Sequence, residues 1–401
     1  MTRLPTSYFG QLIMTLRFSE HGPVFPSKLV DALMAGEVVF LCGAGVSAPQ
    51  LHGFQKLVDL TFERLNVEMS TSEANAYNGG RFEEVLGSLE RRLAEAGRMV
   101  RAVSDLLSVP DEPELDHHAT LLRLSRDLEN RILIVTTNFD TLLERASSAV
   151  APDPVPAKIS FAGQSLPAPS SAEFSGIIHL HGRLADDPLD LTATPLVLTS
   201  SEYGDAYMRS GWASRFLFDL ARCKTIVLIG YSANDAPVRY FLNVLEADRS
   251  RFPGLHQVYA FDSFHENPAD AEAAWGTLAV TPLVYCKTNP QTGHGDHSPL
   301  WNDLEQLAEV IERPKLQRNR RAEAILSSDD ATPNNQVIEE LKWLFTGRGD
   351  LWPVAINSVV NGAWFQIFQD NALWSADEAS WVLPVRTPGI KGATDRPVAP
   401  D

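Results

Sequence analysis

The run of small and apolar residues from Val38 to Pro49 constrains the fold of this chain more than any other stretch. Its first four residues, Val38–Leu41, are all apolar and predict a buried strand of a parallel sheet. A turn containing Gly43 and Gly45 follows, and an amphipathic helix is predicted from Phe54. Because glycine has no Cβ, such a turn lets backbone N–H groups approach a pyrophosphate. A tight strand-to-helix turn without chemical consequence fits the same residues, and the turn alone does not separate the two interpretations.

Three later segments repeat this pattern of an apolar strand that ends in small or polar residues. The strands predicted at 132–135, 176–180 and 225–229 end in Thr137-Asn138-Phe139-Asp140, His181-Gly182 and Gly230-Tyr231-Ser232-Ala233-Asn234-Asp235, respectively. Further strands are predicted at 257–261 and 282–286. Strands that alternate with helices predict an α/β fold: a Rossmann-like, mostly parallel sheet with helices on both faces. Open sheets of this kind bind ligands at the carboxyl ends of their strands.

The rest of the chain divides by its composition. Residues 1–315 are assigned to the α/β domain, with a small helical subdomain inserted at about 70–128, where apolar residues recur at helical spacing. A long helix is predicted from about Asp205 to Arg222. Residues 316–385 form a C-terminal helical, aromatic-rich appendage, in which Trp352, Trp364, Trp374 and Trp381 are four of the eight tryptophans. The Pro- and Gly-containing tail, 386–401, is predicted to be disordered.

Charge and cysteine content exclude several classes of function. The net charge is −17, from 34 basic and 51 acidic residues, which disfavours binding to a nucleic-acid backbone but not to a small anion held by backbone N–H groups. The three cysteines form no Cys-x-x-Cys pair, which argues against a zinc knuckle and a disulfide framework and favours the cytoplasm. No apolar run reaches the roughly 18 residues of a membrane span, and the first residues lack the pattern of a secretory signal, so we expect no membrane association.

Several polar residues at or near the strand ends are candidates for chemistry. Asn138 and Asp140 either face a ligand or cap the following helix, and the sequence leaves both interpretations open. His181 precedes Gly182 at a strand end, the favoured place for chemistry, whereas His179 is predicted to be a packed residue. The adjacent His117 and His118 point to different sides of a helix, so they are predicted to be surface and boundary histidines rather than metal ligands.

The four motifs, taken in order, resemble the sirtuin superfamily over about residues 27–290. They are especially similar to bacterial sirtuin-like proteins of antiphage defence systems, which carry a Gly-Tyr-Ser-x-Asn-Asp signature like that of residues 230–235. The resemblance implies that Gly43, Ala44, Gly45 and Ser47 line the pyrophosphate of NAD. It further implies that Asn138 positions the nicotinamide ribose and a water, that Asp140 contacts the carboxamide, and that His181 engages the ribose hydroxyls. Thr137 belongs to the same NAD-binding set, and Gly230, Ser232, Asn234 and Asp235 would surround the adenosine ribose.

The chain departs from the sirtuin protein deacylases at two points. Thr137 stands where those enzymes usually have glutamine. They also carry a zinc module of two Cys-x-x-Cys pairs after the catalytic histidine, whereas Cys223 is the one cysteine between His181 and Gly230. The module is therefore missing, no zinc is expected, and the acyl-lysine channel that it helps to build is in doubt.

The chemistry follows from the substrate that the resemblance implies. Nicotinamide leaves NAD as a cationic pyridinium, so the site needs no general acid but must stabilise an oxocarbenium-like transition state and position a nucleophile. With no acyl-lysine channel, water is that nucleophile, and the expected activity is an NAD glycohydrolase that depletes NAD in antiphage defence. The alternatives are an NAD-dependent deacylase and a non-catalytic sensor of NAD or ADP-ribose. We also expect a homo-oligomer or a partner such as an ATPase of a defence system, with residues 316–385 as the contact.

Overall fold

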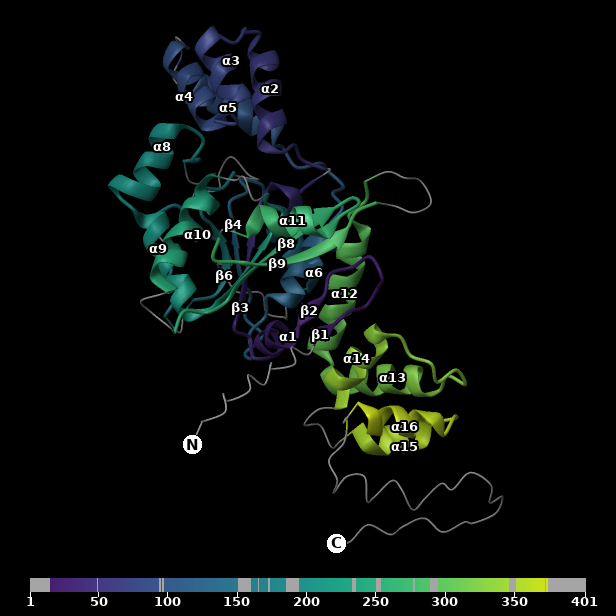
Figure 1. Ribbon diagram of the computed structural model, residues 1–401. Coiled ribbons are helices and arrows are strands. Elements are labelled where there is room, and N and C mark those ends of the chain that lie inside the picture. Colours follow the sequence, from purple (N-terminus) through teal and green to yellow (C-terminus); the bar gives the residue numbers. More distant parts are fainter. Residues whose placement is uncertain are drawn as a thin grey trace, which may run out of the picture. The chain divides into compact units, whose positions relative to one another are not determined.

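The computed structural model describes most of the chain (Figure 1). The described residues are 15–48, 50–93, 95, 97–150, 160–164, 166–171, 174–184, 195–232, 236–249, 254–276, 278–288, 295–345, 351–371 and 373. They divide into two compact units. One unit contains the described parts of residues 1–20, 24–30 and 309–401, and the other contains those of residues 21–23 and 31–308.

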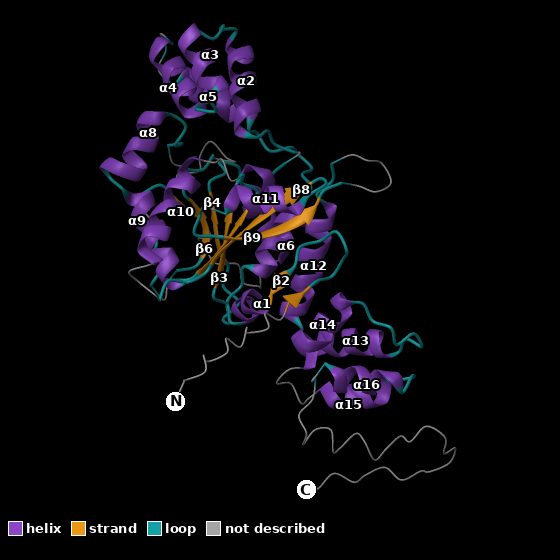
Figure 2. Cartoon of the chain, in the orientation of Figure 1, coloured by secondary structure: helices purple, strands orange, loops and turns teal. Residues whose placement is uncertain are grey.

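A parallel sheet of seven described strands forms the centre of the larger unit (Figure 2). In spatial order the strands are β5 (Ser160–Ala162), β6 (Gly176–His179), β4 (Leu133–Thr136), β3 (Val38–Cys42), β7 (Thr225–Ile229), β8 (Val258–Phe264) and β9 (Thr281–Cys286). Every pair of neighbours in this sheet is parallel. The predicted Rossmann-like α/β fold is therefore confirmed.

β3 is the first strand of this sheet in the sequence, and later strands lie on both sides of it. After β3 the chain adds β4, β5 and β6 on one side, and later adds β7, β8 and β9 on the other. The junction of β3 and β7 is therefore a topological switch point, where open α/β sheets bind ligands. The register aligns the last residues of four strands, because Cys42 pairs with both Thr136 and Ile229, and Thr136 pairs with His179.

Apolar side chains on both faces bury the sheet. On one face Val39, Leu41 and Ile226 pack in a cluster with Phe216 and Leu220 of α9 (Trp212–Cys223). The alternate strand residues, such as Phe40 and Val227, are also buried. Continuous apolar strands are typical of a parallel sheet that is covered on both sides. The other helices that flank strands in the sequence are α1 (Ser27–Met34), α6 (Asp116–Leu124), α7 (Leu142–Val150), α10 (Ala236–Arg249), α11 (Pro268–Trp275) and α12 (Ser298–Glu312).

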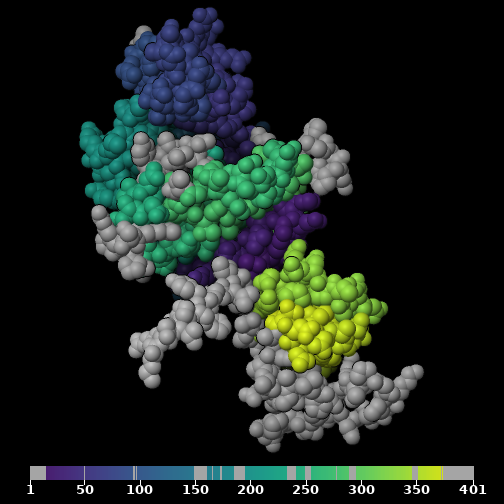
Figure 3. All heavy atoms as spheres, in the orientation of Figure 1, coloured from purple at the N-terminus to yellow at the C-terminus, as the bar shows by residue number. Residues whose placement is uncertain are grey.

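Four helices pack around a second apolar cluster of the larger unit, which also contains Phe139, Leu196 and Leu198 (Figure 3). They are α2 (Phe54–Leu65), α3 (Thr71–Asn78), α4 (Phe82–Arg92) and α5 (Arg98–Leu106). A capping box starts α3, because Ser70 and Glu73 each bond the other's backbone N–H. Arg92 of α4 binds the same Glu73 at 2.9 Å and thereby ties two of the helices together. The helical insertion was predicted at about 70–128. The observed group of helices differs from it at both ends, because it includes α2, which precedes residue 70, whereas α6 packs against α7.

The smaller unit holds the helices that follow the sheet in the sequence. Its helices include α13 (Pro314–Leu326), α14 (Asn335–Phe345), α15 (Trp352–Ser358) and α16 (Ala363–Asp370), and its strands are β1 (Thr15–Leu16) and β2 (Phe25–Pro26). Phe345, Trp352 and Phe368 pack with ring centroids 4.9–5.5 Å apart. Trp374, Trp381 and residues 386–401 lie outside the described residues. None of the described helices is long and apolar enough to cross a membrane.

Candidate active site

The predicted site residues follow the aligned ends of β3, β4, β6 and β7. Gly43 comes directly after β3, Thr137 after β4 and Gly230 after β7, while His181 lies two residues beyond the end of β6. Because the four strands are neighbours in one parallel sheet, these segments lie along a single edge. The sequence therefore predicted correctly that these segments meet at one edge of the sheet, and the ligand site there stays a prediction.

The turns after β3 and β7 press directly against each other. The Gly43 N–H donates to Ile229 O at 2.8 Å, and the Gly45 N–H donates to Gly230 O at 3.0 Å. A Cβ on Gly43 would lie 2.6 Å from Gly230 O, and Gly230 itself has a φ of +75°. The two turns thus require glycine for their own packing. This is what we expected of a tight strand-to-helix turn that has no chemical role. Ala44 and Gly45, in the short 3₁₀ helix Ala44–Val46, are exposed at the edge. The N–H groups of Gly43, Gly45, Val46 and Ser47 are bonded within the two turns, so among the described backbone bonds of this turn the Ala44 N–H is the one without a partner.

Asn138 connects the turn after β3 to the end of β4. Its Nδ2 donates to Gly43 O at 3.2 Å and to Ser47 Oγ at 3.0 Å, and its backbone N–H donates to Thr136 Oγ1 at 3.0 Å. Both N–H groups of the amide are therefore used, and among the described contacts Asn138 Oδ1 has none. Since the residue is half-buried, this oxygen is the acceptor that can face a ligand or a water.

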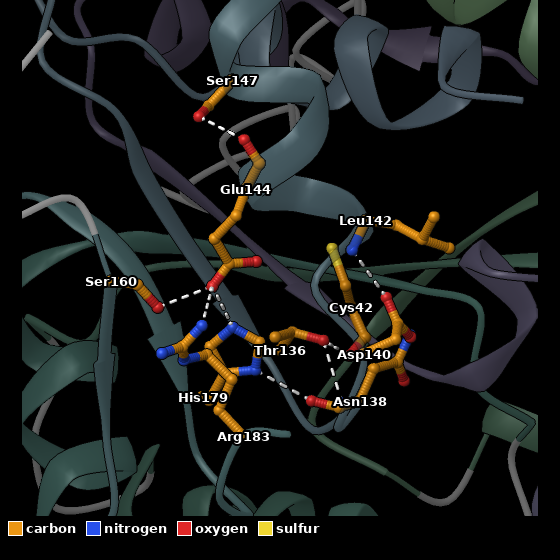
Figure 4. Close-up of polar contacts among 10 residues, drawn as sticks. All are labelled: Cys42, Thr136, Asn138, Asp140, Leu142, Glu144, Ser147, Ser160, His179 and Arg183. Atoms are coloured by element: carbon orange, nitrogen blue, oxygen red, sulfur yellow. Dashed lines mark hydrogen bonds and ion pairs between the residues drawn. The ribbon is translucent and has the colours of Figure 1, made fainter. Parts of the chain in front are cut away.

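Asp140 is a buried carboxylate that accepts hydrogen bonds from two neighbouring groups, of which Figure 4 draws Leu142. Its Oδ1 accepts the Leu142 N–H at 3.1 Å, and its Oδ2 accepts the Ser47 O–H at 2.9 Å. The capping interpretation thus applies to Asp140, at the start of α7, and not to Asn138. Burial raises the pKa of Asp140 above its ordinary value, although these two hydrogen bonds act in the opposite direction.

His118 is a site neighbour that the sequence interpretation missed. Its side chain is 1% exposed, and its Nε2 lies 3.5 Å from Ser47 Oγ. The prediction of a surface or boundary histidine was therefore wrong for His118, because helix α6 carries it inward beside the turn after β3. Burial lowers the pKa of His118 to about 4, so its imidazole is neutral at pH 7. His117 is half-buried and stacks on Trp301 with ring centroids 4.0 Å apart.

Thr137 and Tyr231 link the ends of β4, β3 and β7. The Thr137 hydroxyl lies 2.7 Å from the Tyr231 hydroxyl, which donates to Cys42 O at 3.1 Å. The Thr137 N–H also donates to Cys42 O at 3.0 Å. In this structure Thr137 therefore links the ends of neighbouring strands. Ser232, the residue after Tyr231, is exposed. Asn234 and Asp235 lie outside the described residues.

His179 lies at the centre of a buried polar network beside Asn138 (Figure 4). Its Nδ1 is 3.0 Å from Asn138 O and its Nε2 is 2.8 Å from Glu144 Oε1. Both ring nitrogens thus face oxygen atoms, one a backbone carbonyl and the other a carboxylate. The Ser160 hydroxyl donates to the same Glu144 oxygen at 2.6 Å, and an Arg183 guanidinium nitrogen lies 4.0 Å away. His179 is packed, as predicted, but the network also fixes the backbone of Asn138.

The carboxylate of this network stays ionised because of its partners. Burial of Glu144 acts to raise its pKa, but the charge and hydrogen bond of His179, together with the hydrogen bond of Ser160, outweigh burial and leave the pKa below its ordinary value. Neighbouring carboxyl groups at the start of α7 therefore differ, since the pKa of Asp140 is raised and that of Glu144 is lowered. Glu144 was not predicted as a site residue, because it is one polar residue among many on an amphipathic helix.

His181 lies at the same edge of the sheet but is enclosed by tyrosines. Its side chain is 4% exposed, its Nε2 is 2.7 Å from the Tyr207 hydroxyl, and its Nδ1 is 3.5 Å from the Tyr203 hydroxyl. Burial lowers its pKa to about 3, so the ring is neutral. The described contacts do not join His181 to Asn138, Asp140 or Ser47.

The tyrosines come from a segment that the sequence predicted as part of one long helix. The structure instead has α8 (Ser200–Gly204), a π-helix over Asp205–Arg209, and then α9 from Trp212. Gly211, with a φ of +60°, separates the π-helix from α9, so the helix predicted from Asp205 to Arg222 is broken there. In the part of the chain that the structure describes, no group of three or more His, Cys, Asp or Glu side chains is placed to hold a metal ion.

Comparisons with known proteins agree with this architecture. The family model of the SIR2-like domain matches residues 132–283, a range that runs from β4 into β9 and contains Asn138, His181 and Gly230. The chain is also 49% identical over 350 residues to the uncharacterized protein y4cA of Sinorhizobium fredii (strain NBRC 101917 / NGR234), a match that covers 87% of this chain and 29% of that protein. The chain thus spans less than a third of the length of that relative. The resemblance read from the motifs is confirmed over residues 132–283, where the chain contains a SIR2-like domain.

Proposed function

We propose that this chain hydrolyses NAD at the bond between nicotinamide and ribose, releasing nicotinamide and ADP-ribose. The SIR2-like domain supports an NAD-related function of the sirtuin superfamily. The observation that carries the proposal is the convergence of the Gly43–Ser47 turn, Asn138 and the Gly230 turn at the switch point of the sheet. The exposed Ala44, whose N–H makes none of the described backbone bonds, lies in the turn beside the fixed amide of Asn138. One N–H donor and one oriented side-chain oxygen suit a ligand that is anionic at one end and needs a positioned water at the other.

The reaction requires little proton chemistry from the protein. The bond between ribose C1′ and the pyridinium nitrogen breaks, and its electron pair neutralises the departing nicotinamide. A water oxygen then bonds to C1′ and gives its surplus proton to solvent. The protein must stabilise the positive charge that develops on the ribose and hold the water on the correct face.

Asn138 is the residue we assign to the water. Its two N–H groups are held by Gly43 O and Ser47 Oγ, so its Oδ1 is fixed in direction and can accept a hydrogen bond from water. Asp140 accepts hydrogen bonds from Ser47 and from the Leu142 N–H at the start of α7. Because Ser47 in turn accepts a hydrogen bond from Asn138, Asp140 helps to position the water through Ser47 and Asn138. Its negative charge, placed in a buried site, also favours the developing cation.

A specific observation favours a second candidate, the non-catalytic sensor of NAD or ADP-ribose. Both ring nitrogens of His181 face tyrosine hydroxyls, so in this arrangement the histidine is not available to ribose hydroxyls. A sensor would bind the nucleotide reversibly and leave it intact. The deacylase receives no such support, because the chain has three cysteines and no Cys-x-x-Cys pair from which to build the zinc module.

The test is product analysis by chromatography after incubation of the full chain with NAD. The proposal expects equal amounts of nicotinamide and ADP-ribose, and a rate that does not depend on an acetylated peptide. Intact NAD recovered from a stable complex would support the sensor instead. Formation of O-acetyl-ADP-ribose only when an acetylated peptide is present would support a deacylase.

The wider role is also a proposal, and it rests on the resemblance to bacterial sirtuin-like proteins of antiphage systems. There, loss of NAD would stop an infected cell, which requires an enzyme that stays silent until it is triggered. We propose that residues 316–385 contribute to a homo-oligomer or bind a partner protein, such as an ATPase of the same system. Light scattering of the full chain after size exclusion tests the oligomer, and a monomer at all concentrations would argue against it.

A further inference from the structure

Two tyrosines of one short segment surround the ring of His181. Tyr203 and Tyr207 approach it edge-on, with ring centroids 5.1 and 5.8 Å from that of the imidazole, and they stack on each other at an angle of 14°. The contact of Tyr207 is the closer hydrogen bond, at 2.7 Å against 3.5 Å for Tyr203. A ligand hydroxyl can therefore reach His181 Nε2 only by replacing the hydroxyl of Tyr207.

The protonation states make this bond a stable one. Burial lowers the pKa of His181 to about 3 and raises that of Tyr207 well above its ordinary value. The pair is therefore a neutral imidazole and a neutral phenol over the working pH range. A neutral hydrogen bond of this kind contributes about 0.5–1.5 kcal/mol, and a ligand hydroxyl that takes its place restores a bond of the same type.

The backbone around Tyr207 is anchored, so the side chain is the part that moves. Ser214 Oγ donates to Tyr207 O, and the neighbouring Ala206 is buried in the core cluster of the sheet. Asp205 accepts bonds from Arg209 and Ser210 at 2.6 and 2.7 Å, across the single π-helical turn. π-Helical turns occur frequently at functional sites. Rotation of the Tyr207 side chain then frees His181 without unfolding the segment.

We infer that Tyr207 gates the candidate site: its hydroxyl occupies the His181 nitrogen that a ribose hydroxyl must take, and a hydroxyl-bearing nucleotide enters by displacing it. The inference rests on the proposed function in one respect, namely that His181 meets the ribose. The gate lowers the affinity of the closed form for every nucleotide that must reach His181. It also excludes molecules that cannot replace the lost hydrogen bond, because they would leave a buried ring nitrogen without a partner.

The variant Tyr207→Phe tests the gate, because it removes the hydroxyl and keeps the ring. ADP-ribose binding to the full chain is measured by isothermal titration calorimetry. The dissociation constant is expected to fall about 3- to 10-fold, since the closed form loses its hydrogen bond and the ligand-bound form does not. Tyr203→Phe, which removes the longer contact, is expected to have a smaller effect. Met208→Ala is the matched control, because this neighbouring side chain is 84% exposed, and no change is expected.

A second measurement keeps the gate testable without nucleotide. Modification of His181 by diethyl pyrocarbonate, followed by mass spectrometry of its peptide, is expected to be several-fold faster in Tyr207→Phe than in the wild type or in Met208→Ala. Equal modification rates, or ADP-ribose affinity that is unchanged or weaker in Tyr207→Phe, would overturn the gate. If His181 is modified faster but no variant releases nicotinamide, the gate stands and the proposed hydrolysis fails.

Discussion

The buried pair of Glu144 and His179 gives the sharpest prediction about stability. His179 is fully buried, and its Nε2 lies 2.8 Å from Glu144 Oε1. The substitution Glu144→Gln keeps the size and one acceptor oxygen but removes the negative charge that faces His179 Nε2. A hydrogen bond to a charged group typically contributes about 1.5–3 kcal/mol to stability. We expect Glu144→Gln to lose stability of this order at pH 7.

Urea unfolding followed by circular dichroism measures the loss. With a denaturant dependence of about 3 kcal/mol per molar, the midpoint should fall by about 0.5–1 M. Glu129→Gln is the matched control, because Glu129 pairs with Arg131 at 3.3 Å while its side chain is 68% exposed. An exposed pair contributes less than about 1 kcal/mol, so the control should shift little. Equal midpoints for the two variants would refute the reasoning.

The pH dependence provides a further check on the same pair. The pKa of Glu144 in the folded chain lies below its ordinary value of 4.5. Its contribution is therefore fully present above pH 4.5 and is lost as the pH falls through the lowered value. The difference in stability between the wild type and Glu144→Gln should narrow below pH 4.5. A difference that stays constant down to acid unfolding would contradict the ion-pair assignment.

Two further predictions concern the strand ends. Gly230→Ala should lower the melting temperature by several degrees, because Gly230 has a φ of +75° and the new Cβ would lie 2.7 Å from Val46 N and 2.8 Å from Gly43 O. Gly254→Ala is the control and should leave the melting temperature unchanged, because a Cβ there would meet no atom of the described residues within 4 Å. Asp140→Asn should raise the urea midpoint at pH 7, because burial raises the pKa of Asp140 and ionisation therefore costs stability. This gain should shrink as the pH falls through the raised pKa and vanish below the ordinary value of 3.8, and a gain that persists at pH 3 would contradict it.

The sheet, and the edge at which its polar strand ends meet, were predictable because local sequence determines them. Runs such as Val38–Leu41 and Thr225–Ile229 are apolar at every position, which is typical of strands buried on both faces. Parallel strands end at one edge, so the polar residues that follow them come together whatever the loops do. The convergence of Gly43, Asn138 and Gly230 required no knowledge of distant contacts.

The partners of those residues were not predictable, because they come from helices whose approach depends on tertiary packing. His118 reaches Ser47 from α6, across 71 residues of sequence. Tyr207 reaches His181 from a π-helical turn, and its sequence is compatible with the regular helix that was predicted there. Glu144 lies on α7, where its polar character alone predicts a solvent-exposed position. Helical periodicity shows which face is apolar but not which polar residue the fold will bury.

Nicotinamide release from NAD by the purified full chain is the direct test of the proposed hydrolysis, with Asn138→Ala and His181→Ala measured beside the wild type. We expect release by the wild type. In each variant the rate of release should fall by about 10²-fold or more, as is typical when a group that positions the reacting atoms is lost. Circular dichroism establishes that the variants remain folded. Release that neither substitution reduces, or NAD that stays bound and intact on the wild type, would contradict the proposed hydrolysis.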